Sequence, residues 1–366
     1  MKHTQLILAA ALVALAGCSK ENIDLTGQNS LDNEIGFTAV TRKATKANDA
    51  IITSTTYGTD NSFTVWGWWT EEGDYSEFAT TKTSNFMSGL KIEWTKGANK
   101  NVAGDTHAFA WRNDAHYYYW PFKGEISFLA VHPEGTTLTT NEINATTGTP
   151  VAAISNYAIT DANKTTDLMF ATNKGSNQAA ALPMVFKHAL SQILVKVKTD
   201  DDYTNDVQFD VNSVKFNNID KSGTVTFSDG AISWADNTDQ TAEWMYYNTT
   251  LENISNQYQD FGAALLMVPQ DANTKDANAN PVDETETTIT ISYSMQSLPK
   301  ETSTKLDGTV TIAAPWLTAG ATPASIAGWE AGKKYVYTLN FKLNEILFDP
   351  SIEADWVVVD VKTIDI

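Results

Sequence analysis

Short segments with alternating apolar and polar residues recur along the chain from residue 35 onward. The first of them places Ile35, Phe37 and Ala39 on one face. Further strand-like segments lie at 63–69, 126–132, 193–198, 207–216, 224–227, 231–234, 289–295 and 335–343. A two-residue period is typical of half-buried strands, and many short strands between turn residues are typical of β-sandwiches. The pattern therefore predicts an all-β protein.

Turn and helix signals refine this picture in a few places. The tripeptide Ser228-Asp229-Gly230 separates two of the predicted strands and indicates a β-hairpin. Helical periodicity is weak throughout, and we expect only one short helix, around Ser84–Leu90. The polar segment 271–284 is predicted to be a long loop.

The length of the chain, 366 residues, exceeds that of one ordinary sandwich and fits two domains. A segment of small and polar residues at 174–181 is the expected linker. We therefore predict an N-terminal domain at 35–181 and a C-terminal domain at 182–366. The boundary is placed to within about ten residues.

The formal net charge is -19 at pH 7. A surface this acidic repels phosphate backbones, which argues against a nucleic-acid partner. It also repels anionic lipid, so membrane attachment through a basic patch is not expected.

The N-terminus has the features of an export signal. A short basic start precedes an apolar run at 6–16, which is too short to span a bilayer. The run ends in Leu15-Ala16-Gly17-Cys18, which resembles a bacterial lipobox, and Cys18 is the single cysteine of the chain. We expect a lipoprotein signal peptide at 1–17, lipidation of Cys18 and a polar tether at 18–34. The alternative is an ordinary signal peptide in which this cysteine occurs by chance.

Candidate chemistry is sparse. The five histidines show no metal-ligand spacing, and the sequence contains no nucleophile elbow, phosphate-binding loop or dinucleotide fingerprint. We therefore expect no catalysis, no cofactor and no metal. The aromatic-rich segment 66–120 has two interpretations, a glycan-stacking surface or core packing. Its prominent members are Trp66, Trp68, Trp69, Trp111, Trp120 and Tyr117–Tyr119.

Several short motifs, taken in order, resemble the fimbrillin-like proteins of Bacteroidetes. They cover most of the chain, and their order is more specific than any one of them. The motifs are the lipobox at Cys18, Ile35-Gly36-Phe37 leading to Thr41-Arg42, Tyr119-Trp120-Pro121, the segment 126–133, Asp167-Leu168-Met169-Phe170-Ala171, the segment 186–192, the segment 329–337, and the C-terminal segment 352–356.

This resemblance implies two tandem transthyretin-like β-sandwich domains and a role as a pilus subunit in adhesion. In the family, the precursor travels as a lipoprotein to the outer membrane and reaches the cell surface. A trypsin-like protease then cuts after an arginine and removes the first strand. The corresponding residues here are Arg42 for the cut, with Lys43 and Lys46 as alternatives, and 35–41 for the removable strand.

The resemblance also implies that a strand from another subunit refills the groove. The partner is another copy of this chain or a related pilin, and the C-terminal segment 352–366 is the donor candidate. Its proposed residues are Trp356, Val357, Val359 and Val361. A host or bacterial surface molecule is the expected adhesion ligand. The alternative function is that of a monomeric, glycan-binding surface lipoprotein.

Overall fold

The computed structural model describes residues 33–41, 57–96, 109–177, 180–236, 242–271, 287–313, 328–342 and 346–353. Strands form nearly all of the regular structure in these residues. The only helices there are two 3-10 turns, η2 (Tyr75–Ala79) and η3 (Lys300–Thr302). The predicted all-β class is confirmed.

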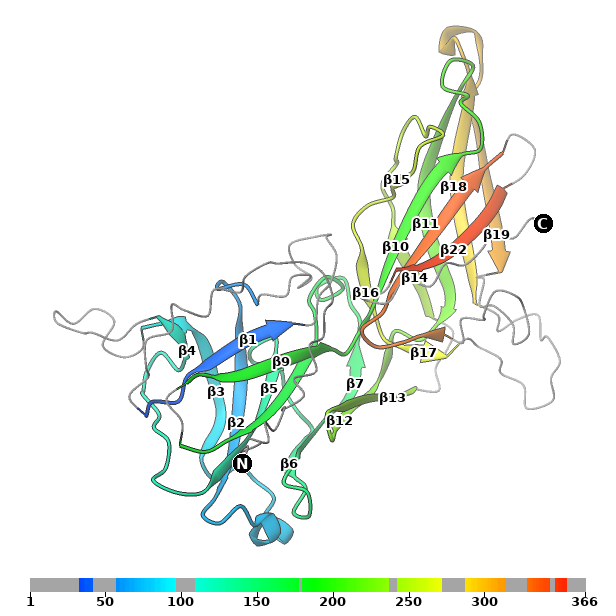
Figure 1. Cartoon of the computed structure of the whole chain (residues 1–366). Helices are drawn as coiled ribbons and strands as arrows, with labels where there is room; N and C mark the ends of the chain where they lie inside the picture. Colours follow the sequence, from blue (N-terminus) through cyan, green and yellow to red (C-terminus); the bar gives the residue numbers. More distant parts are fainter. Residues whose placement is uncertain are drawn as a thin grey trace, which may run out of the picture.

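Seven strands between residues 37 and 188 close into a barrel (Figure 1). In order around the barrel they are β1 (Phe37–Thr41), β4 (Ala110–Arg112), β3 (Met87–Thr95), β2 (Ser62–Thr70), β5 (Glu125–His132), β8 (Met169–Gly175) and β9 (Leu182–His188). Neighbouring strands are antiparallel except β1 and β9, which run parallel. The pairing of β1 with β9 is what closes the barrel.

Side-chain alternation gives the barrel two apolar faces, because successive residues of a strand point to opposite sides. Phe63 and Phe128 point inward, into an aromatic core. Trp68, Leu129 and Phe170, from the same sheet, belong to a second apolar cluster on the outer face. This outer face has to be covered by another part of the chain.

A four-stranded sheet provides that cover. Its strands, in order, are β13 (Ala231–Asp236), β12 (Ser222–Ser228), β7 (Pro150–Ala158) and β6 (Thr140–Ile143). Phe170 of β8 stacks on Phe227 of β12, with ring centroids 5.3 Å apart. The predicted hairpin is confirmed: β12 pairs with β13, and Asp229 and Gly230 have φ of 50° and 73°, as tight hairpin turns require.

The remaining strands form two larger sheets and a short pair. The first sheet contains β15 (Gln259–Asp260), β10 (Ser191–Thr199), β21 (Lys334–Phe341) and β22 (Ile346–Glu353), with β16 (Leu265–Met267) also pairing with β10. The second contains β14 (Ala242–Tyr247), β11 (Val207–Ile219), β18 (Thr288–Ser297) and β19 (Leu306–Ala313). The short pair is β17 (Gln270–Asp271) with β20 (Gly328–Trp329). Phe209 of β11 packs on Phe341 of β21, which joins the two larger sheets.

In Figure 1 the barrel lies at the lower left and the two larger sheets at the upper right, with β7, β12 and β13 between them. One apolar cluster runs from the barrel's outer face through these strands into the larger sheets. The segment 174–181 joins β8 to β9 within the barrel, and the β12–β13 hairpin pairs with β7. The division of the chain into domains at residue 182 remains a prediction.

One prediction of secondary structure is wrong. The expected helix at Ser84–Leu90 is replaced by a turn followed by β3, which begins at Met87 and pairs with β2. Gly89 has a φ of +68°, which does not fit a right-handed helix. Pairing with β2 supplies the backbone hydrogen bonds that a helix would otherwise provide. The predicted loop at 271–284 lies outside the described residues apart from Asp271.

Candidate functional site

The seat of β1 is the most informative site, because few backbone pairs hold this strand. Its five residues pair in parallel with β9, from Phe37 opposite Leu182 to Thr41 opposite Phe186. On the other side, β1 shares one pair with β4, Phe37 with Trp111. Within the described residues, 182–186 of β9 pair with β1 alone, and only the last two residues of β9 pair with β8. Loss of β1 therefore leaves two unpaired strand edges.

The inward side chains of β1 fill the barrel core. Ile35, Phe37 and Ala39 are 2%, 0% and 5% exposed, respectively. The Phe37 ring makes edge-to-face contacts with Phe128 at 5.4 Å and with Phe63 at 6.3 Å between centroids. Burying an aliphatic or aromatic side chain of this size contributes about 1.5–3 kcal/mol. The strand is thus held by its side chains as much as by its backbone.

Residues just before β1 are fixed against the segment that follows β4. Two backbone hydrogen bonds tie them, from Ile35 N to Tyr118 O at 2.7 Å and from Trp120 N to Asn33 O at 2.8 Å. A third bond runs from Leu182 N to Gly36 O at 2.8 Å. The seat of β1 therefore begins at Asn33, four residues before the strand itself.

A buried ion pair joins this segment to the barrel. Nη1 of Arg112, at the end of β4, donates to Oε2 of Glu34 at 2.7 Å, and both side chains are 2% exposed. The guanidinium also lies over the Tyr117 ring, 5.6 Å from its centroid. Pairing two opposite charges so deeply buried offsets part of the cost of taking both out of water. The pair fixes where Glu34 sits relative to β4.

Below the end of β1 lies a buried polar cluster. The Tyr57 hydroxyl lies 2.5 Å from Nδ1 of His132, and Nδ1 of His188 lies 2.6 Å from Oδ2 of Asp167. Burial raises the pKa of Tyr57 and lowers that of His132. Burial also lowers the pKa of His188, but the Asp167 carboxylate more than reverses this, so the net pKa is raised. His188 is therefore paired within the fold, with Asp167.

Tyr57 anchors the chain on the far side of the predicted cut. Its ring stacks on Phe186 of β9 at 5.0 Å and is 1% exposed. Its hydroxyl also lies 2.5 Å from Nδ1 of His132 on β5, so the residues that enter β2 are held by a strand that does not pair with β1. A break after Arg42 does not by itself release β2.

The residues predicted for processing and assembly lie outside the described part of the chain. These are Cys18, Arg42, Lys43, Lys46, Trp356, Val357, Val359 and Val361. The described strands end on either side of them: β1 stops at Thr41, next to Arg42 in sequence, and β22 stops at Glu353. Their roles remain predictions.

The aromatic-rich segment is largely core. Trp66, Trp68, Trp111 and Trp120 are each less than a tenth exposed, which removes these four indoles from any glycan-stacking surface. The exposed aromatic residues of this region are others, among them Phe122, which is fully exposed. Burial therefore favours the packing interpretation for these four tryptophans.

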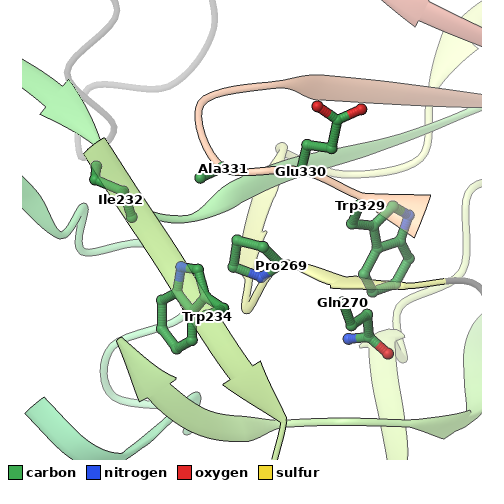
Figure 2. A pocket seen from close by; sticks show the side chains of 7 residues that line it. All are labelled: Ile232, Trp234, Pro269, Gln270, Trp329, Glu330 and Ala331. Atoms are coloured by element: carbon green, nitrogen blue, oxygen red, sulfur yellow. The ribbon is translucent and has the colours of Figure 1, made fainter. Parts of the chain in front are cut away.

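A cleft of about 330 Å³ lies beside β13 and β20 (Figure 2). It is lined by Ile232, Trp234, Pro269, Gln270, Trp329, Glu330 and Ala331. Nε1 of Trp234 donates to the carbonyl of Ala189 at 2.7 Å, and Nε1 of Trp329 to the hydroxyl of Tyr337 at 2.8 Å. The Gln270 amide bonds to backbone groups. These polar groups join strands to one another, so we assign the cleft no ligand.

Among the side chains that the structure describes, no three from His, Cys, Asp and Glu are grouped to hold a metal ion. No described helix has the length and apolar character needed to cross a membrane. The seat of β1 thus remains the candidate functional site.

Comparison with known proteins agrees with this fold. The model of the fimbrillin-like family matches residues 25–356, so the chain belongs to the fimbrillin-like family. This confirms the resemblance predicted from the sequence motifs. No match was found among curated proteins.

One of two similar solved structures supports the fold itself. A fimbrial protein from Bacteroides vulgatus has 17% identity and a TM-score of 0.53, with 87% of this chain and 98% of that chain covered. A candidate cell adhesion protein from Bacteroides ovatus has 15% identity and a TM-score of 0.49, covering 87% and 95%. The first of these similarities shows the fold alone.

Sequence reasoning missed the most specific contact of the site. Glu34 and Arg112 are 78 positions apart, and neither lies in a motif that marks it as half of an ion pair. The available signal was an acidic residue directly before a strand whose alternate residues are all apolar. That signal locates Glu34 but not its partner.

Proposed function

We propose that this protein is a structural subunit of cell-surface fimbriae, assembled by replacing β1 with a strand from another subunit. The observation that supports this most is the pairing of β9, whose first five residues have β1 as their only strand partner in the described chain. A short strand that closes a barrel, next to an arginine in sequence, is suited to removal by a protease.

The physical consequence of removal favours assembly. Without β1, the edges of β9 and β4 present unpaired backbone groups, and the space of Phe37 opens into the aromatic core. Both are unfavourable in water. An incoming strand restores the backbone ladder and refills the core, with alternate side chains setting its register.

The donor in this proposal is the C-terminal segment after β22. β22 is the edge strand of its sheet in the described chain. It pairs with β21 along its whole length, from Ile346 opposite Phe341 to Glu353 opposite Lys334. Residues 354–366 follow it and include the apolar run 356–359. One end of the molecule then offers a strand and the other accepts one.

Export and anchoring complete the proposal. The precursor leaves the cell with its signal peptide, is acylated on Cys18 and reaches the outer membrane surface as a lipoprotein. Two or three acyl chains give stable attachment without a spanning helix. Cleavage after Arg42 then frees the subunit from the anchor and also opens the barrel.

A labelling experiment tests the lipid anchor. Replacing Cys18 by serine should abolish metabolic labelling with palmitate, and labelling that persists in this variant would exclude acylation of Cys18.

A processing experiment tests the central step. The mature chain is treated with an arginine-specific protease and analysed by N-terminal sequencing and by denaturing gels without heating. We expect a new N-terminus at Lys43 and a ladder of stable oligomers. The triple variant Arg42→Ala/Lys43→Ala/Lys46→Ala should give neither the new N-terminus nor the ladder of oligomers when it is treated with trypsin.

The matched control is Lys123→Ala, which removes a cation from another part of the chain. The side chain of Lys123 is 69% exposed. This variant should be processed and assembled like the parent chain. A cleaved chain that stays a single particle at high concentration contradicts strand replacement. Retardation of such a particle by polysaccharide in a native gel would favour the glycan-binding alternative.

A further inference from the structure

Aromatic side chains lie at the surface of the barrel end where β1 begins. The segment that follows β4 reaches this end, since two of its backbone groups bond to Asn33 and Ile35. The end of β2 lies there too, because Nε1 of Trp69 donates to the carbonyl of Lys123 at 3.1 Å. Four residues form what we call the aromatic rim: Trp69 and Tyr118, which are half-buried, and Tyr119 and Phe122, which are exposed.

Phe122 is the most prominent member of the aromatic rim. It is 100% exposed, the largest value among the large hydrophobic residues that the structure describes, and Tyr119 is 51% exposed. One exposed apolar residue is ordinary on a protein surface, whereas several at one end of a barrel indicate an interaction surface.

The backbone on either side of Phe122 is fixed. Before it, the Trp120 indole is buried. After it, the carbonyl of Lys123 accepts the hydrogen bond from Trp69 on β2. Gly124 has a φ of +95°, and a Cβ there would collide with the backbone of β2, so this turn requires glycine. A ring held out to solvent on a fixed backbone loses little conformational freedom when a partner covers it.

The place and chemistry of the rim favour a second copy of the chain as its partner. The rim borders the seat of β1, where the proposed function brings in a strand of another subunit. The Phe122 ring offers no hydrogen bond to a polar ligand, and Nε1 of Trp69 already bonds to Lys123. Because each chain has a net charge of -19, two copies repel one another, and an apolar contact supplies attraction that charge does not.

The rim also bears on the direction of the incoming strand. In the proposed function the donor segment follows β22, so its first residues stay closest to the rest of its own subunit. A strand that runs as β1 does, parallel to β9, has its first residues at the rim. The neighbouring subunit then covers the rim. A strand of the opposite direction would place that subunit at the other end of the barrel and leave Phe122 bare.

We infer that the aromatic rim is a second contact between subunits, on which the next copy rests when its strand replaces β1 in the direction of β1. This inference rests on the proposed strand replacement and adds a contact outside the seat, centred on Phe122. The strand joins the two subunits, and the rim fixes how the neighbour is oriented on the barrel.

Assembly of whole chains, compared with capture of an isolated strand, tests the rim. The full mature chain is cleaved after Arg42, and its assembly is followed by light scattering. Capture of a fluorescent peptide of residues 354–366 by the same cleaved chain is measured on an unheated denaturing gel. Phe122→Ala should slow assembly at least about tenfold, as truncation of a central aromatic residue of an interface does. It should leave peptide capture unchanged, because a peptide brings no further subunit to the rim.

The matched control is Phe109→Ala, which removes another exposed ring from the barrel. Phe109 is 52% exposed and directly precedes β4. Because β4 is antiparallel to β1, with Trp111 opposite Phe37, Phe109 lies towards the end at which β1 stops. Phe109→Ala should assemble like the parent chain. If it is the slow variant instead, the neighbouring subunit sits at the other end and the inference is wrong.

Cross-linking provides a second measurement that does not depend on the peptide. A photoreactive benzoyl analogue of phenylalanine replaces Phe122, and the assembled chains are irradiated, digested and analysed by mass spectrometry. We expect cross-links to another copy at residues outside 354–366. Cross-links confined to 354–366, or formed only within one chain, contradict a contact between the rim and the neighbouring subunit.

The outcomes separate this inference from the proposed function. If the parent chain assembles and Phe122→Ala assembles equally fast, the rim is not a contact and strand replacement stands. If Phe122→Ala lowers assembly and peptide capture alike, Phe122 supports the seat itself and the inference is wrong. If the parent chain neither assembles nor captures the peptide, strand replacement is wrong, and the rim contact with it. Retardation of the parent chain but not of Phe122→Ala by polysaccharide in a native gel would assign the rim to a glycan instead.

Discussion

The barrel and the two larger sheets use the same strand chemistry but close their edges differently. β11 and β18 share ten paired residues, and β21 and β22 share eight. β1 has five pairs with β9 and one with β4. Long pairings thus hold these strands of the larger sheets, whereas the barrel closes through one short strand that lies next to Arg42 in sequence.

The largest expected effect on stability concerns the core beneath β1. Phe37→Ala should lower the free energy of unfolding of the precursor by about 4 kcal/mol, because it leaves a cavity among buried rings. In the cleaved and assembled form the same substitution should have no effect, because Phe37 has left with β1. Urea denaturation of both forms measures this.

The matched control lies in the other region. Phe216 contacts four aromatic side chains, Trp244, Tyr246, Trp329 and Tyr337. Phe216→Ala should destabilise the precursor and the assembled form alike, by about 4 kcal/mol. If Phe37→Ala also weakens the assembled form, β1 has not been replaced.

The ion pair gives the next effect in size. Glu34→Gln should lower the free energy of unfolding of the precursor by about 3 kcal/mol, because it removes the buried carboxylate that Nη1 of Arg112 contacts at 2.7 Å. It should also speed the release of the N-terminal fragment after cleavage at Arg42, as followed by mass spectrometry. The exposed pair Lys82–Glu142 is the control, and Glu142→Gln should change stability by less than about 1 kcal/mol. Equal effects of the two variants would contradict the special role of the buried pair.

The histidines beneath β1 predict how stability depends on pH. The raised pKa of His188 means that its pairing with Asp167 stabilises the fold below about pH 6.5 and that this contribution is lost as pH rises through the raised value. The lowered pKa of His132 acts in the opposite sense, since unfolding takes up a proton as pH falls below about 6.5. The two contributions together should give a maximum of stability near pH 6.5.

Single substitutions separate these two contributions. His188→Asn should lower stability by about 2 kcal/mol at pH 6 and flatten the decline above pH 6.5. His132→Asn should instead flatten the decline below that pH. Urea midpoints between pH 5 and 8 measure both. If the stability of His188→Asn declines above pH 6.5 as steeply as that of the parent protein, the His188–Asp167 pair does not control this decline.

The sequence predicted the strands well where the signal was local. β2, β5, β10, β12, β13, β18 and β21 all follow from alternation or from the hairpin tripeptide, because those patterns are written within a few residues. The helix expected in place of the start of β3 shows the limit, since pairing with β2 overrides a weak local preference. The parallel pairing of β1 with β9, and the contact between Glu34 and Arg112, arise from long-range packing that a single sequence does not encode locally.

The smallest predicted effect concerns the hairpin that links the two regions. Gly230 has a φ of +73°, and an added Cβ there meets only Nζ of Lys187, at 3.6 Å, so Gly230→Ala should cost about 1 kcal/mol of backbone strain. Because β12 pairs with β7 and one apolar cluster runs through both regions, this loss should appear in barrel and larger sheets together. Hydrogen exchange at amides of β5 and β18 measures each region separately. A change confined to β5 would mean that the regions unfold independently, and that the barrel can open while the sheet carrying β22 stays intact.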